Sequence, residues 1–277
     1  MTLLAMTVLI GLGAFAAGLL GALTGLGGGI IIVPLLTLGF GVDLRYAIGA
    51  SLISVIATSS GAAAAYVREG YTNLRVGMLL EVATTLGALA GAWAAAVVAP
   101  NVVAIIFAFV LLFTAVQSFQ PRVEHLTDTS DALARYFRLG STYPVEGIPQ
   151  RYEVQRVPLG FGLMGVAGVL SGLLGIGSGV VKVIAMDRVM HLPFKVSTTT
   201  SNFMIGVTAA ASAGIYLSRG WIDPHLALPV VLGVVAGALT GARLLPRAPV
   251  RSLRLLFTIV LVILAVEMFY NAVTGKI

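Results

Sequence analysis

Long apolar runs separated by short polar segments organise the chain. A helix of about 20 apolar residues spans the hydrocarbon core of a bilayer, and most of the runs approach that length. The runs cover residues 3–24, 30–40, 46–67, 76–98, 102–119, 158–173, 179–186, 196–217, 226–245 and 253–273. The pattern predicts an all-α polytopic membrane protein with about 8 to 10 transmembrane segments, some of them short broken helices.

The runs at 30–40 and 179–186 are too short to span a bilayer alone, and each follows a glycine-rich stretch. These stretches are TGLGGG at 24–29 and LGIGSG at 174–179. Glycine costs about 1 kcal/mol relative to alanine inside a helix, so glycine clusters in apolar sequence indicate breaks. Irregular backbone at membrane depth is tolerated where protein buries it or where it lines a cavity.

Composition supports the membrane class. Apolar residues make up 58% of the chain and charged residues 10%, and the mean hydropathy is +1.01. Soluble domains average about 25% charged residues, which excludes a soluble class. The net charge of +6 comes from basic residues in loops, so it indicates orientation in a membrane rather than nucleic-acid binding. We expect a multi-pass protein of the bacterial inner (plasma) membrane, with its first 24 residues retained as a helix.

The two halves repeat. Gly25, Gly27 and Gly29 match Gly175, Gly177 and Gly179 at a spacing of 150, and GALAGA at 87–92 matches GALTGA at 237–242. Between them, 42–57 aligns with 190–205 if two residues are inserted later in the second half. We predict a first transmembrane repeat at 1–119, a polar connector at 120–157 and a second repeat at 158–277.

The connector carries five arginines balanced by five acidic residues. We expect it to be solvated, with a surface helix over 124–138. Tyr143, Pro144, Gly147 and Pro149 argue against regular structure later in the connector.

Arginine and lysine positions predict the topology. Four crossings per half would leave the basic residues evenly divided between the two sides. Five crossings per half gather most of them on the side of the connector and leave Arg45, Arg219 and Lys276 on the other. We therefore expect an inverted repeat with a cytoplasmic connector and both termini outside.

Paired glycine breaks at matching places in two halves are a sequence pointer to a transporter binding site. The N–H groups and the partial positive charge at a new helix start favour an anion. We therefore predict a substrate site at Gly27, Gly28, Gly29, Gly177, Ser178 and Gly179. Close helix packing is the alternative, and it is the preferred interpretation for Gly87, Gly91, Gly237 and Gly241.

Hydroxyl groups open the helices after each short run. They supply neutral donors that suit an oxyanion, and the alternative roles are helix capping and interhelical bonds. Charge inside an apolar run indicates function, and two such residues are candidates here. Lys182 is a candidate to pair with the anion, or else snorkels to the surface. Glu81 is a candidate for proton coupling, or else pairs with Arg75 at the interface. The polar candidates are Ser51, Ser54, Thr199, Thr200, Ser201 and Asn202.

The segment GLGGGIIIVPLL, the segment LGIGSG and the Ser/Thr-rich helix starts together resemble the sulfite exporter TauE/SafE family, also called the toluene sulfonate uptake permeases. The resemblance covers nearly all of the chain outside 120–157. It implies a carrier for small sulfur oxyanions or organosulfonates such as sulfite, thiosulfate or sulfoacetate. The second half departs from the first at Ile184, which stands where the first half has Pro34, and at Lys182, which stands in place of Ile32.

We therefore expect a secondary transporter that works by alternating access and not an enzyme. A negative interior pushes an anion out by about 2.3 kcal/mol per 100 mV, so export needs no coupling ion, whereas uptake does. The alternatives are an anion channel, a carrier for a non-sulfur anion and, with less support, a membrane enzyme.

His125, His191 and His225 lie in loops, and we expect no metal and no cofactor. The expected partners are a small anion and lipid, and the oligomeric state stays open.

Overall fold

The computed structural model describes residues 3–24, 28–68, 70–119, 130–145, 148–244 and 250–276. The first half contains five long or short helices and one π-helical segment. They are α1 (Leu3–Thr24), α2 (Gly29–Pro34), η1 (Leu35–Gly39), α3 (Leu44–Arg68), α4 (Leu74–Val97) and α5 (Pro100–Phe119). The second half contains α7 (Val157–Leu174), α8 (Gly179–Ile184), η2 (Ala185–Val189), α9 (Phe194–Ser218), α10 (Pro224–Leu244) and α11 (Val250–Val273).

Six of the described helices are long and apolar enough to cross a membrane: α1, α4, α5, α7, α10 and α11. Helices α3 and α9 are longer still, at 25 residues each, but they carry the hydroxyl-rich segments. Large apolar side chains such as Met78, Trp93 and Leu239 are exposed on the outer surface of the bundle. Lipid, not water, suits such a surface, and helices satisfy their backbone polar groups internally. The prediction of an all-α polytopic membrane protein is confirmed.

The helices of the two halves match at one constant offset. Helices α2, α3, α4 and α5 begin at residues 29, 44, 74 and 100, and their counterparts α8 to α11 begin at 179, 194, 224 and 250. Each difference is 150. The two-residue insertion that the sequence alignment introduced is therefore wrong, and residues 42–57 correspond to 192–207. The correct register makes Ser51 the counterpart of Ser201.

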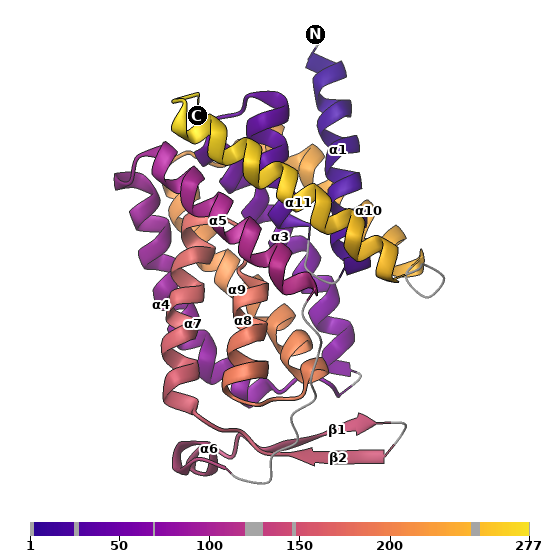
Figure 1. Cartoon of the computed structure of the whole chain (residues 1–277), viewed down its shortest axis with the longest axis vertical. Helices are drawn as coiled ribbons and strands as arrows, with labels where there is room; N and C mark the ends of the chain where they lie inside the picture. Colours follow the sequence, from indigo (N-terminus) through magenta and orange to yellow (C-terminus); the bar gives the residue numbers. More distant parts are fainter. Residues whose placement is uncertain are drawn as a thin grey trace.

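Each half is packed mainly against the other (Figure 1). Helix α1 packs on α10 and α4 on α7, while α3 packs on its counterpart α9 and α5 on its counterpart α11. Glycines permit the first two contacts, because a methyl group on Gly91 would overlap the carbonyl oxygen of Val169, and one on Gly237 that of Phe15. The packing interpretation of these glycines is confirmed, and the contacts lie within one chain.

The short helices change pitch at the same place in both halves. The α-helical turn of α2 passes into η1 directly after Pro34, and α8 passes into η2 directly after Ile184. The change of pitch therefore does not require proline, because the second half makes it with Ile184 at the position of Pro34. Where α2 passes into η1, the Thr37 hydroxyl donates to the carbonyl of Val33, 2.9 Å away.

The connector has more regular structure than the sequence predicted. Strands β1 (Ser141–Val145) and β2 (Ile148–Tyr152) form an antiparallel hairpin in which Pro144 lies opposite Pro149. The expectation of irregular structure here is wrong, because both strands are edge strands, where proline is tolerated. Among the described residues of the expected 124–138 helix, only α6 (Ala132–Tyr136) is α-helical, and residues 124–129 lie outside the described part.

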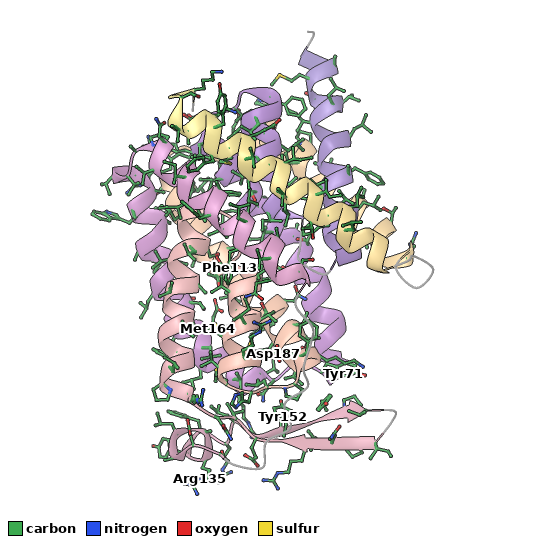
Figure 2. The ribbon with its side chains drawn as sticks, viewed as in Figure 1. Tyr71, Phe113, Arg135, Tyr152, Met164 and Asp187 are labelled. Carbon is green, nitrogen blue, oxygen red and sulfur yellow. The ribbon has the colours of Figure 1, made fainter. Side chains whose placement is uncertain are left out.

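The hairpin lies at one end of the bundle, and both chain termini lie at the other (Figure 1). Asn73, before α4, ties the hairpin to the helices: its side-chain amide donates to the carbonyl of Leu139 and to the hydroxyl of Tyr152, both at 2.8 Å. Figure 2 shows Tyr152 over the hairpin, below Asp187 and Tyr71 at the end of the bundle.

Candidate functional site between the two helix breaks

The two glycine breaks meet at the contact between α3 and α9. Ser51 on α3 donates its hydroxyl to the carbonyl of Gly29, at 3.2 Å, or to that of Gly175, at 2.8 Å. Ser201, its counterpart on α9, donates to the carbonyl of Gly179 at 3.3 Å. The breaks of both halves and one serine from each long helix therefore form one buried cluster.

The second break has the backbone geometry that glycine permits. Gly175 and Gly177 have φ angles of 67° and 70°, and Ser178 follows with φ of 47°. Ser178 is 4% exposed, and its hydroxyl has no hydrogen-bond partner in the described part of the chain. A buried hydroxyl without a partner is costly, and it is available to a ligand.

The first break packs tightly against helix α1. Gly28 and Gly29 are buried, and Gly28 lies against the backbone of Gly18 on α1. Gly27 lies outside the described residues, so its predicted place in the site stays a prediction.

Lys182 is fully buried, with 0% of its surface exposed. Its ammonium Nζ donates to the hydroxyl Oγ1 of Thr208 on α9 at 2.6 Å. The Lys182 side chain thus points into the bundle and does not snorkel to the surface, which contradicts that alternative. Burying an isolated ammonium is expensive, so a cation in this position requires a compensating anion.

Glu81 on α4 supplies that negative charge through the same hydroxyl. Its carboxylate oxygen Oε1 accepts from Thr208 at 2.7 Å and from Thr85 at 3.1 Å. The carboxylate is 9% exposed, and its second oxygen has no partner in the described structure. The alternative of an interfacial pair with Arg75 is wrong, because Arg75 donates to the carbonyl of Arg138 instead.

Several predicted ligands have structural partners instead of facing the breaks. Ser54 donates to the carbonyl of Ser51 in its own helix. Thr199 donates to the carbonyl of Tyr71, and Thr200 accepts from the backbone N–H of Asn73 at 3.0 Å. These contacts fasten the start of α9 to the turn between α3 and α4. They favour the interhelical alternative for Thr199 and Thr200, whereas Ser54 bonds its own helix and Asn202 is half-buried beside Ser201.

Thr208 was not predicted, although a signal for it exists. It follows Ser201 by seven residues and precedes Ser212 by four, so the three hydroxyls share one face of α9. Thr85 and Thr84 on α4 had no comparable signal, because single hydroxyls are common in membrane helices.

The charged network has no second copy related by the repeat, because it joins Glu81 of the first half to Lys182 and Thr208 of the second. At the offset of 150, Lys182, Thr208 and Glu81 correspond to Ile32, Thr58 and Val231. Among the described residues, the Thr58 hydroxyl bonds only the carbonyls of Ser54 and Val55 in its own helix. The two halves therefore share their fold and their breaks, but each half lacks the charge that the other contributes to this network. Within the described residues, no group of three His, Cys, Asp or Glu could hold a metal ion.

Several apolar helices around a buried polar cluster define a multi-pass integral membrane protein. The sequence model of the family "Sulfite exporter TauE/SafE" matches residues 10–268, and the chain belongs to this family of membrane transporters.

Curated relatives carry names of the same kind. The chain is 27% identical over 274 residues to the "Probable membrane transporter protein YunE" of Bacillus subtilis, covering 96% of this chain and 98% of that protein. It is 28% identical over 249 residues to YdhB of the same organism, covering 88% and 94% of the two chains. It is 23% identical to the ORF9 transporter protein of a Sinorhizobium species, covering 92% and 89%. No solved structure matches the chain.

Proposed function

We propose that this membrane transporter is a carrier that exports small sulfur oxyanions or organosulfonates, such as sulfite, thiosulfate or sulfoacetate. The observation that carries the proposal is the fully buried Lys182 beside the Gly175–Gly179 break. A cation in an apolar bundle selects for a negatively charged ligand, and family membership points to sulfur oxyanions.

The proposed substrate site combines the cation with uncharged donors. Ser178 offers a buried hydroxyl that has no hydrogen-bond partner among the described residues, and Ser51 and Ser201 lie at the two breaks. The backbone at Gly28, Gly29 and Gly179 begins the two short helices. Neutral donors bind an oxyanion loosely enough for release, which a carrier needs.

Alternating access is proposed from an inverted-repeat arrangement. Gly49, near the start of α3, lies against the carbonyl of Trp221, just beyond the end of α9, and Thr199 near the start of α9 bonds Tyr71, just beyond the end of α3. These two helices are therefore antiparallel, which supports inverted halves. Two such halves can rock around a site held between them.

Export is proposed as the working direction. A carrier moves its substrate down the total gradient that acts on the substrate and on any coupled ion. An anion produced inside the cell is more concentrated there, so its own concentration gradient drives it outward.

Thermal unfolding of the purified protein tests the substrate class. The panel is sulfite, thiosulfate, sulfate, sulfoacetate, taurine, 4-toluenesulfonate, chloride and phosphate. A ligand at 100 times its Kd stabilises by about 2.7 kcal/mol. We expect a saturable shift with a sulfur anion that Lys182→Ala abolishes and the surface control Lys195→Ala retains. A shift with phosphate or chloride alone would reject the sulfur substrates.

Counterflow in proteoliposomes tests the carrier mechanism. A carrier exchanges labelled internal anion for unlabelled external anion faster than it allows net efflux. A channel shows no such acceleration, so equal rates would overturn alternating access.

A further inference from the structure

The two opposite charges inside the bundle share a single hydroxyl group. The Lys182 ammonium donates to Thr208 Oγ1 at 2.6 Å, and Thr208 is within 2.7 Å of Glu81 Oε1. Thr208 has one hydrogen, which it can give to Glu81 or to the Met204 carbonyl at 2.8 Å. The carboxylate therefore compensates Lys182 through one bridging atom rather than by direct contact, and a small rearrangement separates the charges.

Other charged and titratable groups on the neighbouring elements lie near the ends of the bundle. Helix α7 carries none, and α5 carries none. The α3 residues whose side chains are described carry such groups only at the start of that helix. Around the pair, the remaining groups are Arg75 on α4, Asp187 and Arg188 on η2, and Lys195 and Tyr216 on α9. Asp187 is as buried as Glu81, at 8% against 9% exposed, but Glu81 is the carboxylate that shares a hydroxyl group with Lys182.

An anion that binds Lys182 takes the place of Glu81. The carboxylate is then left in an apolar interior with two threonine hydroxyls and no cation. A buried carboxylate without a cation neutralises by binding a proton. An anion bound at Lys182 would also lie close to Glu81, and an ionised Glu81 carboxylate would repel it.

We propose that Glu81 binds one proton for each anion that Lys182 binds, so that the carrier moves an anion and a proton together. The inference rests on the proposed function, because it requires an anion at Lys182. The proton enters from the side where the anion binds, forms an O–H bond on Glu81, and leaves with the anion on the other side.

The charge count supports this coupling. The empty site holds Lys182 as a cation and Glu81 as an anion, for a net charge of zero. The site loaded with a monovalent anion holds the Lys182 cation, the ligand anion and neutral Glu81, again for zero. The empty site and the loaded site can therefore each open to either side of the membrane without moving net charge across the membrane potential. The counterparts Ile32 and Val231 cannot take part, so the ratio is one proton per anion.

Proteoliposomes that contain a pH-sensitive dye test the ratio on the unmodified protein. The probes are thiosulfate, sulfoacetate and 4-toluenesulfonate, whose charges are fixed near neutral pH. We expect external anion to acidify the interior by one proton per anion taken up. For 4-toluenesulfonate, uptake should not change when a potassium gradient with valinomycin sets the membrane potential. Uptake that responds to the potential without acidification would overturn the proposal.

The variant Glu81→Gln separates coupling from binding. It mimics the protonated carboxyl, so counterflow exchange should persist while net uptake and acidification fall at least tenfold. Glu267→Gln, an exposed glutamate on α11, is the matched control and should behave as the unmodified protein. Proton-linked net uptake in Glu81→Gln would overturn the coupling role of Glu81. Absence of counterflow for every probe in the unmodified protein would instead overturn the proposed function, and the coupling with it.

Discussion

Ser51 reaches across the two halves of the protein to Gly175, which is 124 positions later in the chain. The Ser51 hydroxyl lies 2.8 Å from the Gly175 carbonyl and 3.2 Å from the Gly29 carbonyl, so it sits between both helix breaks. Because the group is fully buried, neither carbonyl has water to replace it. This serine therefore fixes the distance between the two breaks.

We predict that Ser51→Ala destabilises the protein by about 1–3 kcal/mol, since it leaves a buried carbonyl without a donor. Ser54→Ala is the matched control, because its hydroxyl bonds only the backbone of its own helix. Thermal unfolding in detergent compares the two. Equal melting temperatures for both variants would contradict the bridging role of Ser51.

The glycine contact between α4 and α7 gives a second prediction. A methyl group on Gly172 would overlap the carbonyl of Ala88, whereas a methyl group on Gly162 of the same helix meets no atom within 4 Å. We expect Gly172→Ala to cost about 1–3 kcal/mol or more by overpacking. Gly162→Ala should be neutral or stabilising by up to about 1 kcal/mol, since alanine is the better helix former. Unfolding in the two variants measures the difference, and a stable Gly172→Ala would argue against the packing.

The parts of the fold that depend on a single local pattern could be predicted from the sequence. Run lengths predicted the helices, and the matched breaks at Gly29 and Gly179 predicted the repeat. The Lys182–Thr208–Glu81 network required more, because it joins three helices whose facing sides depend on tertiary packing. Pattern alone could not decide whether Lys182 points inward. The β1–β2 hairpin was missed because Pro144 and Pro149 argue against strands except at an edge.

Thr208 and its counterpart Thr58 allow a test within the repeat. Thr208→Val removes the hydroxyl that joins two buried charges, while Thr58→Val removes one that bonds only its own helix. Hydrogen bonds to charged groups contribute about 1.5–3 kcal/mol, so we expect a loss of that size for Thr208→Val. Thr58→Val should change stability by less than about 0.5 kcal/mol. Similar melting temperatures would show that the bridge contributes nothing.

A double-mutant cycle measures the charge pair itself. Lys182→Ile installs the residue that the first half carries at the matching position, Ile32, and Glu81→Val installs the residue that the second half carries, Val231. Each single change leaves an uncompensated buried charge, and we expect a cost of about 3–5 kcal/mol. The double variant removes both charges and should be more stable than either single variant, although it should not bind the anion. Additive losses would show that the two residues do not interact.

Tyr152 gives a prediction for alkaline pH. Burial raises the pKa of its phenol from 10.0 to about 12, although hydrogen bonds with Asn73 and Ser141 lower it. The folded state therefore holds this proton when the unfolded state has released it. Its contribution to stability is complete below pH 10 and is lost as pH rises from 10 towards 12.

We expect unfolding temperatures of the unmodified protein to fall more steeply over this range than those of Tyr152→Phe. Tyr136→Phe is the control, because Tyr136 is 79% exposed. The Tyr152→Phe variant also loses the acceptor for the Asn73 amide, so its stability at neutral pH should be lower by about 1 kcal/mol. The same pH slope in all three proteins would show that the phenol of Tyr152 titrates freely in the folded state and that the hairpin does not shield it.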